Sequence, residues 1–179
     1  MLKHARGSSP ERPMIPLTYG RDETDSARQL GLIITEADGF FETNSENGLM
    51  TGTVGEGFRR RAFQLLENLP RVRGGRAEVG VLFSSLTRDL VDTYVSGPYD
   101  VGGTVHMRAF REVVGLLARE HIQFDVIPLE GATPRELEMY RYLIAPEVRV
   151  LTHEMRSSLS GYGGILLVVG RLGCLDEHG

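Results

Sequence analysis

The single cysteine, Cys174, has the residue type and setting of a possible catalytic nucleophile. It follows the apolar run 165–169 through a short loop, and a cysteine on a tight turn after a strand can attack a carbonyl carbon. Such a turn favours glycine two positions to either side, whereas this chain has Leu172 and Asp176 there. A base and an orienting acid are also required, and only Glu177 and His178 follow at close range. Cys174 is therefore a weak catalytic candidate, and a plain loop thiol is the alternative.

Two acidic residues, Glu36 and Asp38, follow another apolar run, 30–35. A carboxylate at the end of a barrel strand is the arrangement found in glycosidases, which need a second carboxylate at a fixed separation. Nothing in the sequence identifies that second carboxylate. Solvated acids in a loop are the alternative.

The sequence predicts no metal or nucleotide site. The histidines share no metal-ligand spacing, and they lie at positions 4, 106, 121, 153 and 178. The glycines at 97, 102 and 103 match neither phosphate-binding glycine pattern. We therefore expect no cofactor and no metal, and a flexible loop over 96–104.

The elements that would position a site are clearest after residue 76. Short runs rich in apolar residues occur at 77–83, 124–127, 142–145 and 165–169. Helical patterns separate them, at 106–120 and, with Thr152 as N-cap, from there to about residue 162, and a short turn or helix is expected within 129–139. Strands that are apolar throughout and alternate with helices indicate a doubly wound α/β fold, with a parallel sheet covered on both faces.

Ligands of doubly wound sheets bind beyond the carboxyl ends of the strands. In this chain that edge would carry Ser84, Ser85, Glu130 and Arg171, which are the candidate ligand-binding residues. Arg171 could hold an acid or an anion there. The alternative is a structural role, such as a salt bridge between subunits.

Residues 1–75 differ in sequence pattern from the region after residue 76, because they contain many turn signals and few regular helix or strand patterns. Within them a helix is expected over 54–69, and a short buried strand over 30–35. Pro70 and the glycine pair Gly74-Gly75 end that helix. We therefore expect an irregular N-terminal extension over 1–75 and an α/β domain over 76–179.

The composition limits the partners of the chain. A net charge of −4 argues against nucleic acid, and no apolar run is long enough to span a membrane. We expect no signal peptide from the N-terminal residues, and one cysteine excludes an internal disulfide. The expectation is a cytoplasmic protein without a membrane or nucleic-acid partner.

The C-terminal part resembles one particular domain. The sequence Tyr142-Leu143-Ile144-Ala145-Pro146 is followed by Leu151-Thr152-His153-Glu154, then by the glycine pair and apolar strand of 161–171, and then by Asp176-Glu177. In this order and spacing the region 76–179 resembles the middle, or trimerisation, domain of family 42 β-galactosidases. That resemblance implies a flavodoxin-like, class I glutamine-amidotransferase-like fold.

The resemblance also implies a function. The domain would support assembly of a carbohydrate-active enzyme as a homo-oligomer, with a trimer as one form, and would catalyse nothing by itself. Because the barrel that bears the catalytic carboxylates is not recognisable and the chain stops after Asp176-Glu177, it is interpreted as a fragment or a degenerate form. Two alternatives stay open: a small amidotransferase-like hydrolase that uses Cys174, and a domain that binds a small molecule at the strand edge.

Overall fold

The computed structural model describes residues 77–92 and 105–178, together with a few earlier positions: 17–18, 31, 41–42, 57, 60, 61, 64, 65, 67 and 68. The chain divides into two compact units, Met1–Gly74 and Gly75–Gly179. The site and the proposals below concern the second unit.

In the first unit, β1 (Leu17–Thr18) pairs in parallel with β2 (Phe41–Glu42). The described residues between 57 and 68 are helical, and the Asn68 side chain donates to the Gln64 carbonyl at 2.7 Å. The expected helix over 54–69 is thus described in part, and its Leu65 is 48% exposed. The expected strand over 30–35 lies outside the described residues except for Gly31, which is helical, and Glu36 and Asp38 lie outside them too.

The second unit is built on a four-stranded parallel sheet, which confirms the predicted α/β fold class. Its strand order is β4-β3-β5-β6, and its strands are β3 (Val79–Phe83), β4 (Phe124–Pro128), β5 (Tyr142–Pro146) and β6 (Ile165–Val169). The sequence placed Pro128 and Pro146 just beyond their strands, whereas each is the last strand residue. Pro128 lies on the edge strand β4, where proline is tolerated, and the pairing of β5 with β3 ends at Ile144, before Pro146.

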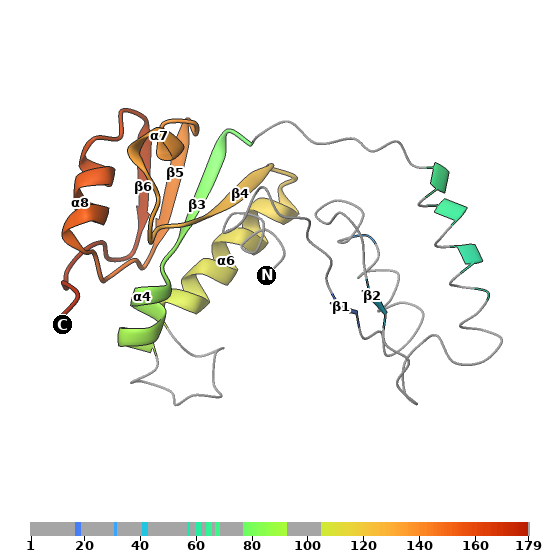
Figure 1. The fold of residues 1–179 in the computed structure, drawn as a ribbon, viewed down its shortest axis with the longest axis horizontal. Helices are drawn as coiled ribbons and strands as arrows, with labels where there is room; N and C mark the ends of the chain where they lie inside the picture. The colour runs from blue at the N-terminus through green and yellow to red at the C-terminus, as the bar shows by residue number, and fades with distance from the viewer. Residues whose placement is uncertain are drawn as a thin grey trace. The chain divides into compact units, whose positions relative to one another are not determined.

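Short and long helices connect these strands (Figure 1). They are α4 (Ser85–Thr87), the π-helical turn η1 (Arg88–Asp92), α6 (Val105–Arg119), α7 (Pro134–Leu137) and α8 (His153–Ser160). The predicted N-cap of α8 is confirmed, since the Met155 N–H donates to Thr152 Oγ1 at 3.3 Å. The helix ends at Ser160, two residues before the predicted end, with Gly161 as its C-cap. The loop expected over 96–104 lies outside the described residues.

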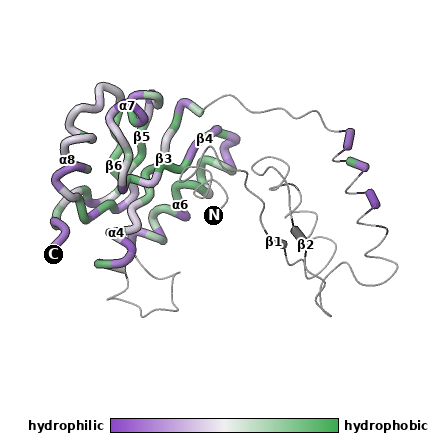
Figure 2. The backbone as a smooth tube through the Cα atoms, in the orientation of Figure 1, coloured by the Kyte–Doolittle hydropathy of each residue, from purple (hydrophilic) through white to green (hydrophobic). Residues whose placement is uncertain are grey.

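The sheet has an apolar core on each face. On one face α6 packs through Phe110 and Leu117 against strand residues such as Val81 and Ile144. On the other, residues of α7 and α8 pack against Leu82 and Leu143. In Figure 2 the strands β3 and β5 are correspondingly apolar, while α8 is mixed along its length. Adjacent strand residues thus serve opposite cores, which is why these strands are apolar throughout.

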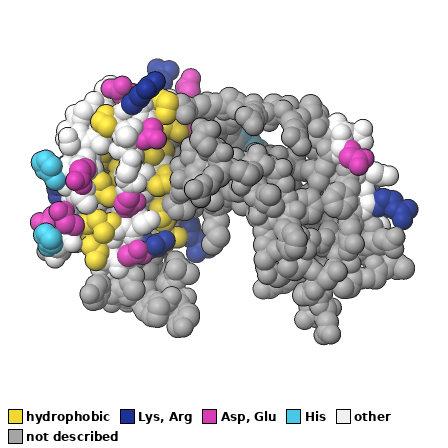
Figure 3. All heavy atoms as spheres, viewed as in Figure 1, with side chains coloured by type: hydrophobic (Ala, Val, Ile, Leu, Met, Phe, Trp, Pro, Cys, Tyr) yellow, Lys and Arg dark blue, Asp and Glu magenta, His cyan; other side chains and the backbone are white. Residues whose placement is uncertain are grey.

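The edge strand β6 departs from the expected burial on both faces. Four of its five side chains are 42–51% exposed, namely Ile165, Leu167, Val168 and Val169, and only Leu166 is half-buried. Figure 3 shows apolar side chains at the surface of this unit, interspersed with acidic ones. An apolar strand sequence predicts that both faces of the strand are buried, but burial also requires other elements to pack on those faces. The prediction of a sheet covered on both faces is therefore wrong for β6.

Within the described ranges, no helix has the length and apolar character needed to cross a membrane.

Candidate functional site

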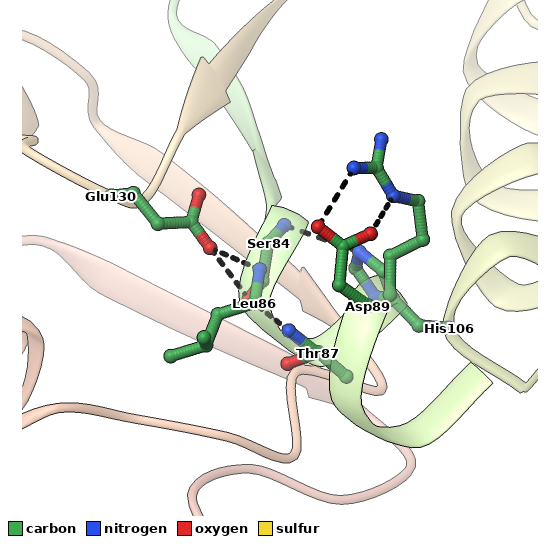
Figure 4. A network of polar contacts seen from close by, with 7 residues as sticks. Ser84, Leu86, Thr87, Asp89, His106 and Glu130 are labelled. Carbon is green, nitrogen blue, oxygen red and sulfur yellow. Dashed lines mark hydrogen bonds and ion pairs between the residues drawn. The ribbon is translucent and has the colours of Figure 1, made fainter. Parts of the chain in front are cut away.

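Ser84 occupies the point where β3 ends and α4 begins. Its backbone is extended, and its Oγ accepts a hydrogen bond from the Thr87 N–H at 3.0 Å, so that it caps the helical turn. The same Oγ donates to Glu130 Oε1 at 2.9 Å (Figure 4). Ser84 is fully buried. Its hydroxyl is therefore held by its own chain on both its donor and its acceptor side.

Glu130 comes from the loop directly after β4 and reaches across to α4. Its Oε1 accepts a second hydrogen bond, from the Leu86 N–H at 2.8 Å. Its Oε2 is buried and has no hydrogen-bond partner. One carboxylate oxygen thus fixes the turn that follows β3, and this joins the ends of two neighbouring strands.

His106 closes the network from the first turn of α6. It is fully buried, and its Nε2 accepts from the Ser84 N–H at 3.1 Å while its Nδ1 lies 2.7 Å from the Pro146 carbonyl oxygen. A carbonyl oxygen can only accept, so the proton is assigned to Nδ1 and the ring is neutral. The imidazole therefore bridges the carboxyl ends of β3 and β5.

The three side chains Ser84, His106 and Glu130 do not form a catalytic triad, although their types would suit one. In a triad the imidazole accepts from the nucleophile's hydroxyl, and the acid holds the other ring nitrogen. Here the imidazole accepts from the backbone of Ser84, and the acid holds the hydroxyl. This arrangement positions the chain and activates no nucleophile.

Arg88 and Asp89 lie at the rim of the same network. Arg88 Nε donates to Asp89 Oδ1 at 2.6 Å, and the guanidinium lies 5.9 Å from the centre of the Phe83 ring. The hydrogen bond to Asp89 raises the pKa of Arg88, and the negative charges of Asp89 and Glu130 add to this effect. Because both side chains of the pair are more than one-third exposed, their attraction contributes little to stability.

Thr87 extends the network to the loop after β5. Its side chain is fully buried, and its Oγ1 accepts from the Val150 N–H at 3.1 Å. Together with His106, this bond fixes the β5 end of the sheet against the turn after β3. The network thereby uses its polar groups to join β3, β4, β5 and α6 at the edge where a doubly wound sheet would bind a ligand.

The predicted site residues fall into two separate groups. Ser84 and Glu130 are hydrogen-bonded to each other, and Ser85 is half-buried beside them in α4. Arg171 and Cys174 are exposed and follow β6, which lies two strands, or about 10 Å, from β3. Ligand binding by the four predicted residues stays a prediction, as does the reactivity of Cys174. No group of three or more metal-ligating side chains occurs among the described residues.

Sequence reasoning missed His106 and Thr87 as members of the network. His106 and Phe110 are four residues apart and both lie on the buried side of α6, with ring centres 6.3 Å apart. This spacing was a usable signal that His106 faces the core. Nothing in the sequence indicated its partner atoms, which come from residues 22 and 40 positions away.

Comparisons with known proteins find similarity of structure. No family model matches the chain, and no match is found among the curated proteins. Among solved structures, the β-galactosidase from Bacillus circulans sp. alkalophilus matches with a TM-score of 0.76 at 16% identity, over 98% of this chain and 30% of its own. Gan42B, a GH42 β-galactosidase of G. stearothermophilus, matches with a TM-score of 0.75 at 16% identity, over 99% of this chain and 30% of its own. The β-galactosidase from Rahnella sp. R3 gives 0.70 at 15% identity, over 93% and 29%.

These matches establish a likeness of fold to family 42 β-galactosidases over nearly the whole chain. The chain spans about 30% of the length of those enzymes. The resemblance seen in the sequence is confirmed at that level, and the assignment to the middle domain belongs to the proposal below.

Proposed function

We propose that the Gly75–Gly179 unit is a non-catalytic assembly domain, equivalent to the middle domain of a family 42 β-galactosidase. The observation that carries this proposal is the state of the sheet's carboxyl edge. The buried groups of Ser84, Thr87 and His106 are hydrogen-bonded within the chain, and Ser84 is fully buried. A strand edge closed in this way holds the fold together and presents no nucleophile to a substrate.

The order of sequence motifs and the fold support the same role. The strand ending in Pro146, the capped helix α8 and the glycine pair before β6 are the features through which the sequence resembles that domain. The fold likeness to β-galactosidases is independent of those motifs, because identity is only 15–16%. The unit would then belong to a carbohydrate-active enzyme and bind other copies of the same chain. The oligomer that the resemblance implies is a trimer.

Two measurements on the purified full chain test the proposal. Light scattering coupled to size exclusion is expected to give a discrete oligomer, and a nitrophenyl β-galactoside is expected to be hydrolysed no faster than in buffer. A monodisperse monomer would contradict the assembly role. Hydrolysis that is lost in Cys174→Ala or Ser84→Ala would contradict the non-catalytic role and favour a hydrolase.

A further inference from the structure

The ends of β3 and β5 lie side by side at the point where the strand order of the sheet reverses. The chain runs from β3 to β4 on one side, and β5 and β6 follow on the other side. In doubly wound sheets, the carboxyl ends of the strands at such a switch point enclose the place where ligands bind. In this chain the fully buried imidazole of His106 joins these two strand ends, because it contacts both the Ser84 N–H and the Pro146 carbonyl.

Both of these partners of the imidazole are backbone groups with a fixed role in hydrogen bonding. The Ser84 N–H, 3.1 Å from Nε2, can only donate, and the Pro146 carbonyl oxygen, 2.7 Å from Nδ1, can only accept. One neutral tautomer of His106 satisfies both. In the protonated ring Nε2 also carries a hydrogen, so that two donors face each other across 3.1 Å inside the protein. Protonation therefore breaks the hydrogen bond between α6 and the end of β3.

Glu130, the other titratable side chain that holds Ser84, does not have this sensitivity. Its Oε1 accepts both hydrogen bonds of the network, from the Ser84 hydroxyl and the Leu86 N–H. Its Oε2 is buried and has no hydrogen-bond partner among the described residues. A proton taken up on Oε2 leaves both hydrogen bonds to Oε1 in place. His106 and Glu130 reach Ser84 from different sides (Figure 4), so that one contact can break while the other stays.

Apart from Glu130, the described charged side chains on the elements around the imidazole are paired with each other or exposed. They are the pair Arg88–Asp89 after β3, the pair Glu147–Arg149 after β5, and the exposed Arg108, Arg111, Glu112 and Arg119 of α6. The rings of Phe83 and Phe110 flank the imidazole, with centres 5.4 and 6.3 Å from its own. Buried, apolar surroundings of this kind favour the neutral form of histidine.

We propose that His106 is a pH-sensitive switch, which holds the ends of β3 and β5 together while its imidazole is neutral and releases them when the ring is protonated. The switch lies within one chain and does not depend on the assembly function proposed above. Its release frees the turn 84–87 and the first turn of α6, while the two apolar cores stay packed. The groups set free are the Ser84 N–H and the Pro146 carbonyl, a donor and an acceptor at the edge where such sheets bind ligands.

The switch has a definite direction in pH. Because the closed form holds the ring of His106 neutral, the opened form binds a proton more readily. The contribution of the ring to the closed form is therefore complete above the ordinary histidine pKa of about 6.5, and it declines as the pH falls below that value. Each pH unit of this decline corresponds to a factor of about ten in the opening equilibrium.

Amide hydrogen exchange of the full chain, measured by NMR between pH 7 and pH 5, tests the switch. After correction for the intrinsic pH dependence of exchange, the protection factor of the Ser84 amide is expected to fall about tenfold. The Val81 amide, in the middle of β3, should keep its protection. A Ser84 protection factor that is constant over this range would overturn the proposal. Equal falls at Ser84 and Val81 would also overturn it, because they would show unfolding of the whole unit.

Substitutions identify the group that takes up the proton. His106→Gln supplies one donor and one acceptor but does not titrate, so the pH-dependent loss of protection at Ser84 is expected to disappear. The matched controls are His153→Gln, at an exposed histidine of α8, and Glu130→Gln, and both should retain the loss. A loss that persists in His106→Gln, or that disappears in Glu130→Gln, would overturn the proposal. If His106→Gln does not fold, the comparison of Ser84 with Val81 in the wild type decides.

Discussion

The strands β3 and β6 are both apolar five-residue strands of one parallel sheet, yet their surroundings are opposite. In β3 the residues Val81, Leu82 and Phe83 are 0–4% exposed, and the strand ends in a network that uses the hydroxyl and backbone N–H of Ser84. In β6 the exposed fraction reaches 51%, and the outward backbone groups of Leu166 and Val168 have no neighbouring strand in the described sheet. The difference shows that an apolar strand sequence is buried only where neighbouring elements pack on both of its faces.

The largest expected difference between the two strands is in stability. Leu82→Ala removes a fully buried side chain from the core, and we expect it to lower the free energy of unfolding by about 2 to 5 kcal/mol. Leu167→Ala removes a half-exposed side chain, and in dilute protein the expected loss is at most about 1 kcal/mol. Urea unfolding measures both. Equal losses would show that β6 is as buried as β3.

The next largest effect concerns the network at the end of β3. Glu130→Ala leaves the Ser84 hydroxyl and the Leu86 N–H without their acceptor, with an expected cost of about 1 to 3 kcal/mol. Glu130→Gln keeps an amide oxygen in the place of Oε1 and should recover part of this loss. Glu138→Ala, at an exposed glutamate, should stay within about 0.5 kcal/mol of wild type. If Glu130→Ala were as mild as Glu138→Ala, the network would not hold the strand ends.

Removing the N-cap of α8 should lower the stability of the fold without changing the oligomeric state. Thr152 caps α8, which leads from β5 to β6, and Thr152→Ala should cost about 1 kcal/mol. Because the cap lies outside the strand, the mass of the folded protein by light scattering should not change. Thr152→Ser, which keeps the hydroxyl, should restore most of the stability. A Thr152→Ala protein that is fully stable but dissociated would reverse the roles assigned to these regions.

The smallest effect is a pH dependence just before β6. Burial raises the pKa of Tyr162, whose hydroxyl donates to the Tyr140 carbonyl at 3.0 Å. With a folded pKa above the unfolded value near 10, its contribution to stability is complete below about pH 10 and is lost as the pH rises through the folded pKa. Unfolding of Tyr162→Phe should lack this part of the decline at high pH. An identical decline in both proteins would assign it to other groups.

Sequence reasoning predicted the fold class because each of the four runs is apolar and each is followed by a turn signal. It placed the cap of α8 correctly because Thr152 lies directly before a helical pattern. It could not predict the exposure of β6, since the composition of Ile165–Val169 is that of an inner strand and burial depends on neighbours distant in the sequence. For the same reason it proposed Ser84 and Glu130 as ligand-binding residues without the partner atoms that hold them. Arg171 was grouped with them by strand ends alone, although β6 lies two strands away from β3.

The most direct test of the account follows amide hydrogen exchange by NMR. Its central claim is that β3 is enclosed by neighbouring strands and buried, whereas β6 is exposed and has β5 as its one neighbouring strand in the described sheet. The Leu166 and Val168 amides should exchange quickly, and the amides of Val81 and Leu82 should be protected. Amides of Leu166 and Val168 that are as protected as those of Val81 and Leu82 would contradict the claim.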